Sequence, residues 1–194
     1  MTPIEDIADT LDKLRRHGKI RCYGVSNHTV EQLRAVRAYG PFNACQPPYS
    51  LLDPKIEADL LPYCAANRIG VMVYSPLHKG LLTGKYTGRE TFTDFRMNHP
   101  DFQGDRFRQI AQAVQRLKPM AEKYGLSLYQ LILAATLMHP AIQVAVVGIK
   151  TPDQIAEAAG AVAKTLERPD YYAIRSALAL DAAAKVKDAS GKVK

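Results

Sequence analysis

The stretch DLLPYCAANRIGVMVYS, residues 59–75, decides the fold class of this chain. Its first part, from Asp59 to Asn67, predicts a short helix, and its second part, from Val71 to Ser75, is a β-branched and apolar run. Polar and apolar residues do not alternate cleanly in that run, which is typical of a strand covered on both faces in a parallel sheet. Such a unit, repeated, builds an α/β protein.

Similar strand and helix signals recur along the whole chain. Three further runs of the same kind lie at residues 22–27, 43–46 and 144–148. Sequences that begin helices, with a Ser or Thr three residues before Glu or Gln, start at Thr2, Thr29, Ser127 and Thr151. We therefore predict seven helical segments: 3–17 before Gly18, one opening at 29, 59–67, 106–124 with a bend or break near Pro119, 127–139, one opening at 151, and 170–187.

The alternation of strands and helices favours a parallel α/β sheet with right-handed crossovers. Two architectures qualify, an open doubly wound sheet and part of a (β/α)8 barrel. Four units cannot close a barrel, which needs eight units and about 250 residues. We expect residues 1–194 to form a single domain, with a frayed tail at about 188–194.

Composition narrows the classes of function. Of the 194 residues, 47% are apolar and 23% are charged, the balance of a soluble globular protein. No apolar run approaches the roughly 18 residues of a membrane span, and the first residues do not resemble a signal peptide. Three widely spaced cysteines indicate a reducing compartment, so we expect a cytoplasmic protein. The net charge of +7 is spread along the chain, which favours small anionic ligands over nucleic acid.

Polar side chains follow the apolar strand runs. They are Ser26, Asn27, Gln46, Tyr74 and Ser75, and they should project at one edge of a parallel sheet. Hydroxyl and carboxamide groups of this kind can recognise an amide, and an aromatic ring can stack on a flat heterocycle. The alternative is that Asn27 and Gln46 only satisfy buried loop backbone.

A second candidate site lies where the last strand run meets a helix. Gly148 allows close approach to the backbone, Lys150 adds a charge, and the helix opening at Thr151 offers unpaired N–H groups, which together predict a phosphate site. An ordinary capped helix with a solvated Lys150 is the alternative. The connection 78–104 follows a strand and is long enough for a functional lid.

The sequence predicts no metal site and no hydrolytic site. The five histidines lack metal-ligand spacing, and no Gly-x-Ser-x-Gly elbow or Ser-His-Asp set is apparent.

Several of these segments resemble a known family when they are taken together. They are GVSN at 24–27, QPPYSLL at 46–52, YSPL at 74–77, GLLTGKY at 80–86 and VGIKTPDQ at 147–154. In this order and spacing the chain resembles the aldo-keto reductases, especially the bacterial branch related to potassium-channel β subunits. Members of that family are (β/α)8 barrels that bind NADPH across the carboxyl ends of the strands. The resemblance covers only their second half, strands five to eight, so it implies a half-barrel of four βα units.

The resemblance implies eleven cofactor-binding residues. The nicotinamide carboxamide would be held by Ser26, Asn27 and Gln46, with Tyr74 stacked on the ring. The ribose and diphosphate would lie along Ser75, Leu77, Lys79 and Gly80. The adenosine 2′-phosphate would be surrounded by Gly148, Lys150 and Gln154. Ala158 stands where the family often has Asn, which removes one expected adenine contact.

The family reduces aldehydes and ketones with NADPH, using an Asp, a Tyr, a Lys and a His from the first half of the barrel. No segment here matches those motifs, so we assign no catalytic residue and expect little or no carbonyl reduction by this chain alone. The expectation is a truncated carboxy-terminal half with Met1 as an internal start. Two alternatives remain, a non-catalytic nucleotide-binding module and a homodimer of half-barrels, because a half-barrel exposes an apolar interior and two sheet edges.

Overall fold

The computed structural model describes residues 2–180, which divide into two compact units. Unit 1 comprises residues 2–49, 54–74 and 139–146, and unit 2 comprises 50–53, 75–138 and 147–180. A single domain over 1–194 stays a prediction, and the tail expected at 188–194 lies outside the described residues.

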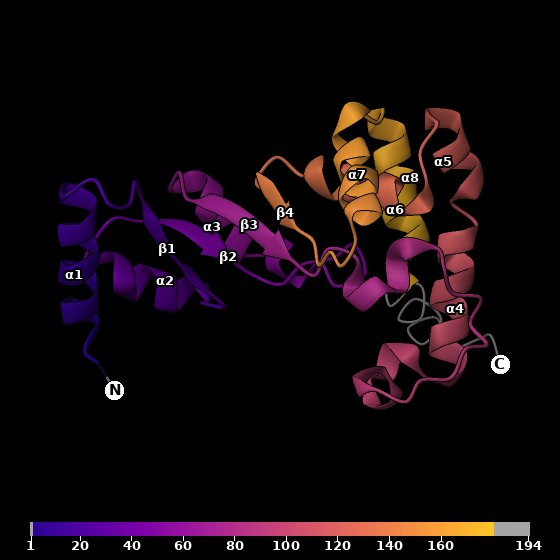
Figure 1. Ribbon diagram of the computed structural model, residues 1–194, viewed down its shortest axis with the longest axis horizontal. Coiled ribbons are helices and arrows are strands. Elements are labelled where there is room, and N and C mark those ends of the chain that lie inside the picture. The colour runs from indigo at the N-terminus through magenta and orange to yellow at the C-terminus, as the bar shows by residue number, and fades with distance from the viewer. Residues whose placement is uncertain (1, 181–194) are drawn as a thin grey trace, which may run out of the picture. The chain divides into compact units, whose positions relative to one another are not determined.

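Unit 1 contains a four-stranded parallel sheet in the order β1-β2-β3-β4 (Figure 1). The strands are β1 (Tyr23–Ser26), β2 (Phe42–Gln46), β3 (Gly70–Tyr74) and β4 (Val144–Val146). All four predicted strands are confirmed to within two residues at each end. Neighbours in the chain are neighbours in the sheet, without the reversal of strand order that defines a doubly wound sheet. The order is the one that a barrel requires.

The helices of unit 1 begin largely where their sequences predict. They are α1 (Ile4–Arg16), α2 (Val30–Arg37) and α3 (Leu60–Ala66), with a 3-10 turn η1 (Lys55–Glu57). At α2, Thr29 and Gln32 form the expected reciprocal capping box. The box predicted at Thr2 is wrong, because Pro3 occupies the cap position with extended backbone and no side-chain hydrogen bond is made there. Gly18, with φ of +70°, follows the end of α1 as expected.

Gly24 allows β1 and β2 to approach one another closely. A Cβ atom at this position would lie 2.1 Å from the carbonyl oxygen of Ala44 on the neighbouring strand. The pairing register also shifts between Tyr23 and Gly24. The missing side chain therefore permits the bulge that precedes the polar end of β1.

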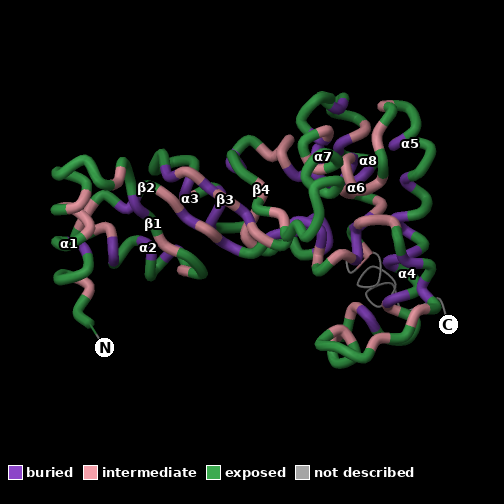
Figure 2. Tube along the Cα trace, viewed as in Figure 1, coloured by how far each residue is buried: buried purple, intermediate pink, exposed green. Residues whose placement is uncertain are grey.

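Along the strands of the sheet, buried residues alternate with more exposed ones (Figure 2). Cys45, Val71 and Val73 are fully buried, whereas Val144 and Val146 of β4 are 42% and 40% exposed. Our expectation of strands covered on both faces is therefore wrong for β4. A run of valines indicates a strand, but it does not indicate which of the strand's faces another segment covers.

Unit 2 is built from helices and short turns. They are α4 (Gly104–Gln115), α5 (Lys118–Tyr124), α6 (Leu128–Leu137), α7 (Pro152–Gly160) and α8 (Arg168–Leu178), with 3-10 turns η2 (His78–Thr83), η3 (Phe95–Asn98), η4 (Pro100–Phe102) and η5 (Ala161–Ala163). The break near Pro119 is confirmed between α4 and α5. The last predicted helix, 170–187, corresponds to α8 over its first part, and its predicted residues 181–187 lie outside the described residues. Among residues 2–180, no helix is both long and apolar enough to cross a bilayer.

Candidate cofactor site

The carboxyl ends of β1, β2 and β3 bring four predicted site residues of unit 1 together. Ser26 and Gln46 are register partners, and the Ser26 hydroxyl donates to the Gln46 carbonyl oxygen over 3.0 Å. The Asn27 backbone N–H donates to the same oxygen over 3.2 Å. The Tyr74 hydroxyl donates to Asn27 Oδ1 over 2.9 Å. The side chains of Ser26, Asn27 and Tyr74 therefore gather at this edge of the sheet, next to the Gln46 backbone carbonyl.

Asn27 adopts a left-handed backbone conformation with φ of +59°, which Asn tolerates better than most residues. This conformation turns the chain sharply at the end of β1. The Asn27 side chain bonds a tyrosine hydroxyl rather than loop backbone. No hydrogen-bond partner of the Gln46 carboxamide lies within residues 2–180. Neither side chain therefore serves the purely backbone-satisfying role that was the alternative.

In unit 2, the segment after β3 contains an unusual left-handed turn. His78, Lys79 and Gly80 have successive φ values of +47°, +55° and +89°, and Ser75 has +59°. Such conformations cost about 1–2 kcal/mol for each non-glycine residue, so neighbouring contacts must hold them. Leu77 is buried, and its carbonyl oxygen accepts from the Gly80 N–H over 2.9 Å.

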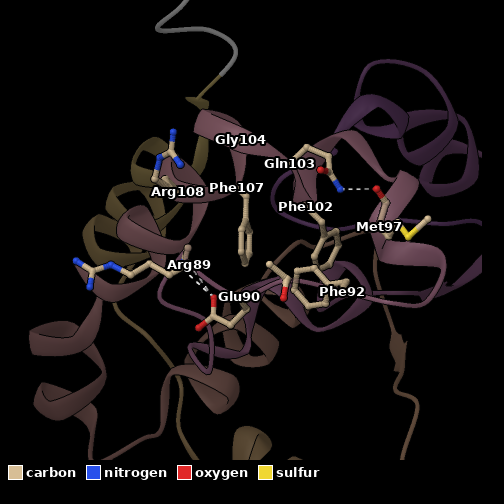
Figure 3. A pocket seen from close by; sticks show the side chains of 11 residues that line it. Arg89, Glu90, Phe92, Met97, Phe102, Gln103, Gly104, Phe107 and Arg108 are labelled. Atoms are coloured by element: carbon tan, nitrogen blue, oxygen red, sulfur yellow. Dashed lines mark hydrogen bonds between the residues drawn. The ribbon is translucent and has the colours of Figure 1, made fainter.

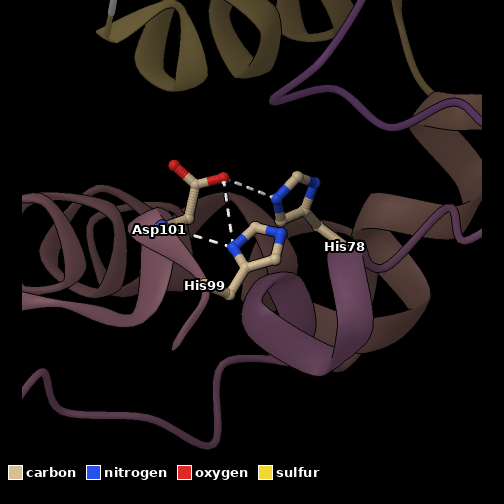
Figure 4. A group of neighbouring side chains, drawn as sticks. All are labelled: His78, His99 and Asp101. Carbon is tan, nitrogen blue, oxygen red and sulfur yellow. Dashed lines mark hydrogen bonds and ion pairs between the residues drawn. The ribbon is translucent and has the colours of Figure 1, made fainter. Parts of the chain in front are cut away.

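A polar cluster that the sequence did not reveal surrounds His78 (Figure 4). His78 Nε2 lies 2.8 Å from Asp101 Oδ2, and His78 Nδ1 lies 3.0 Å from the hydroxyl of Ser50. Asp101 Oδ1 accepts from Arg106 Nε over 3.0 Å. Ser50 and Asp101 are 28 and 23 positions from His78 along the chain, so no local spacing could have indicated these contacts.

The contacts within the cluster shift the pKa values of Asp101 and His99. The bonds from His78 and Arg106 hold the pKa of Asp101 well below its usual value. Burial and the charge of Lys79, whose Nζ lies 3.1 Å from His99 Nε2, lower the pKa of His99. One nitrogen from each of His78 and His99 and one carboxylate oxygen of Asp101 lie within 4.8 Å of one another, a spacing that could hold a metal ion. These atoms already contact other protein groups, and the cations Lys79 and Arg106 lie beside them. The arrangement resembles a Ser-His-Asp set, but Ser50 is 1% exposed and cannot meet a substrate.

The residues predicted to bind a phosphate lie at the start of α7. The Thr151 hydroxyl accepts from the Gln154 N–H over 3.4 Å, and Gln154 Oε1 accepts from the Lys150 N–H over 2.7 Å. A Cβ at Gly148 would meet nothing within 4 Å. Lys150 and Gln154 are exposed, so a cation and a helix start face open space here.

A cavity of about 550 Å³ lies beside the 88–108 segment (Figure 3). Phe102 and Phe107 are among the residues that line it, and each is 3% exposed. Phe92 packs edge-on against both rings, with centroids 5.2 and 5.5 Å away. The carboxylate of Glu90 accepts N–H bonds from the preceding backbone. The rings form a small core that orders the long connection, and the cavity contains none of the predicted site residues.

The eleven predicted residues thus occupy three places. Ser26, Asn27, Gln46 and Tyr74 cluster in unit 1. In unit 2, Ser75, Leu77, Lys79 and Gly80 belong to the left-handed turn, and Gly148, Lys150 and Gln154 belong to the start of α7.

The sequence matches the Aldo/keto reductase family over residues 1–179. The chain belongs to this family of oxidoreductases. It is 36% identical over 181 residues to Aldo-keto reductase YhdN of Bacillus subtilis, covering 92% of this chain and 55% of that protein. It is 32% identical to the NADH-specific methylglyoxal reductase of Escherichia coli, covering 90% of this chain and 53% of that protein.

A solved structure supports the same relationship. The glycerol dehydrogenase AKR11B4 from Gluconobacter oxydans superposes with a TM-score of 0.85 at 34% identity. That match covers 91% of this chain and 54% of the other. The chain therefore spans about half the length of the relatives it matches.

Proposed function

We propose that this chain binds a nicotinamide dinucleotide, NADPH, and supplies the cofactor side of a carbonyl reductase. The observation that carries this proposal is the cluster of Ser26, Asn27, Gln46 and Tyr74 at the strand ends. A primary amide offers one acceptor and two donors, and these side chains offer complementary groups. Tyr74, held by its bond to Asn27, offers a ring face for the pyridine.

Unit 2 supports the proposal with two groups suited to phosphates. The left-handed turn combines the exposed cation of Lys79 with Gly80, where the missing side chain lets a ligand approach the backbone. The start of α7 combines Lys150 with free space at Gly148, which suits the 2′-phosphate of NADPH. The Escherichia coli relative is named as NADH-specific, so the choice between the two cofactors is itself part of the test.

We further propose that these residues correspond to strands five to eight of a barrel, and that the 194-residue chain alone reduces carbonyls slowly or not at all. No segment matches the Tyr, Lys, Asp and His motifs implied by the resemblance. The nicotinamide supplies the hydride when bound, and this chain's residues orient its amide and phosphates. The substrate of a complete site would be a small aldehyde or ketone.

Titration of NADPH fluorescence with the purified chain tests cofactor binding. We expect saturable binding that Asn27→Gly weakens about tenfold, because Gly keeps the left-handed backbone while removing the carboxamide. Asn43→Ala, at an exposed position of β2, is the matched control and should bind as the wild type does. Lys150→Ala should reduce the preference for NADPH over NADH, whereas Lys118→Ala should not. Absence of binding by the wild type would refute the proposal.

The expectation of weak activity needs its own assay. NADPH oxidation with 4-nitrobenzaldehyde should stay at background for the chain alone. Sustained turnover would show that the chain itself contains a proton donor for the reaction.

A homodimer is the second candidate, favoured by the exposed valines of β4. Val144 and Val146 point from the same face of the strand, and within the described chain β1 and β4 each pair along one edge only. Pairing of two such sheets would cover this apolar face. Sedimentation equilibrium should then give twice the 21.4 kDa mass, and Val144→Lys should give the monomer. A clean wild-type monomer would exclude half-barrel pairing.

A further inference from the structure

The left-handed turn in unit 2 is fastened by side chains that come from outside it. Backbone bonds from the Gly80 N–H to Leu77 and from the His78 N–H to Ser75 close the turn locally. The His78 side chain is only 13% exposed and spans two other segments, Ser50 on one side and Asp101 on the other. A residue in a strained conformation is thus anchored at both ring nitrogens.

The anchor continues beyond His78. Asp101 also binds Arg106 at the start of α4, and the Ser50 hydroxyl also accepts from the Asp53 N–H over 3.2 Å. The four side chains Ser50, His78, Asp101 and Arg106 therefore form one continuous chain. It links the turn to a helix and to a tight bend, both fixed by their own backbone bonds.

The side chain of Lys79, the next residue, is less constrained than that of His78. Its side chain is exposed at the turn, and its only described partner is His99, over 3.1 Å. The ammonium group can therefore leave His99 for an anion while its backbone stays in place. The His78 side chain is therefore held in place at both ring nitrogens, whereas the Lys79 ammonium group can move to a ligand.

We propose that His78, through Ser50 and Asp101, is a positioning residue that holds the Lys79–Gly80 turn in its diphosphate-binding shape. The inference rests on the proposed function, since it assumes that this turn meets the cofactor diphosphate. In this role His78 touches neither cofactor nor substrate. It fixes the backbone from which Lys79 reaches the ligand, so its loss should weaken contacts to the diphosphate and spare contacts to the 2′-phosphate.

The test compares two ligands by titration, NADPH and adenosine 2′,5′-bisphosphate, which lacks the diphosphate bridge. His78→Asn keeps a residue that tolerates the left-handed backbone but cannot span both partners, and Asp101→Asn keeps the shape without the charge. We expect each to raise the dissociation constant of NADPH about tenfold, the size of one lost charge-assisted bond, and to change that of the bisphosphate less than twofold. His17→Asn and Asp105→Asn, both at exposed positions, are the matched controls and should change neither.

The outcomes separate this inference from the proposed function. If the wild type binds neither ligand, the proposed cofactor site fails. If the wild type binds NADPH and His78→Asn binds it equally well, the positioning role fails alone. Equal weakening of both ligands by His78→Asn would indicate a general folding defect and would also overturn the specific role. Stoichiometric Zn²⁺ binding that His99→Asn abolishes would assign the cluster to a metal instead.

Discussion

Replacing Gly24 by Ala should separate β1 from β2 at the polar end of the sheet. The added Cβ would lie 2.1 Å from Ala44 O, 2.6 Å from Ala44 C and 2.8 Å from Ala44 Cβ. All three atoms are backbone or the first side-chain atom, so no flexible group can move aside. Ordinary contact needs about 3.4 Å, and the strands must therefore part by about 1.3 Å.

The energetic cost follows from that displacement. Paired strands lie about 4.8 Å apart, and a backbone bond of about 2.9 Å lengthened by this amount is no longer a hydrogen bond. Loss of about two such bonds, at about 1 kcal/mol each, together with disturbed packing gives about 2–3 kcal/mol. With a urea m-value of about 2 kcal/mol/M, the unfolding midpoint should fall by about 1–1.5 M. The Ser26 bond to Gln46 lies two residues away, so NADPH affinity should fall as well.

Urea unfolding followed by circular dichroism measures the effect. Gly148→Ala is the matched control, because its Cβ would meet nothing within 4 Å and its φ is not left-handed. That control should unfold within about 0.5 kcal/mol of the wild type. Equal midpoints for Gly24→Ala and Gly148→Ala would show that the strands are not as close as the structure has them.

Three further predictions concern other parts of the chain. The buried Tyr23 hydroxyl has no hydrogen-bond partner within residues 2–180. Tyr23→Phe should therefore leave the free energy of unfolding unchanged or raise it by about 1 kcal/mol in the same urea assay. A decrease of more than about 1 kcal/mol would show that the hydroxyl does form a hydrogen bond. Cys45 and Cys64 are fully buried, and contact between their sulfurs together with burial raises the pKa of the Cys64 thiol. Ellman's reagent should therefore react with Cys22 alone before unfolding and with all three thiols afterwards. Burial raises the pKa of Glu90, but bonds from the Thr87 and Gly88 backbone outweigh it and lower that pKa from 4.5 to about 2. The Glu90 carboxylate therefore stabilises the folded chain above pH 4.5, and this stabilisation is lost as the pH falls toward 2. The stability difference between wild type and Glu90→Gln should accordingly shrink from pH 6 to pH 3, and a constant difference would contradict the assignment.

Local signals predicted the elements of this fold well. The capping boxes at Thr29 and Ser127 formed as expected because all their partners lie within four residues. The box at Thr2 did not form, since Pro3 took the cap position. Strand valines identified β4, but not which of its faces is covered, because coverage depends on distant segments.

The candidate site shows the same division. Ser26, Gln46 and Tyr74 could be grouped from sequence because each ends a strand, and parallel strands place their carboxyl ends at one edge. The Ser50–His78–Asp101 network could not be grouped, because its members lie in three segments without regular spacing.

The sequence by itself determined the succession of strands and helices and the polar residues at the strand ends, since each depends on interactions between near neighbours in the chain. Only the tertiary structure decided the strand order, the close approach at Gly24 and the anchoring of the left-handed turn by His78. Those features depend on which distant segments meet, and contacts of that kind leave no periodic trace along the chain.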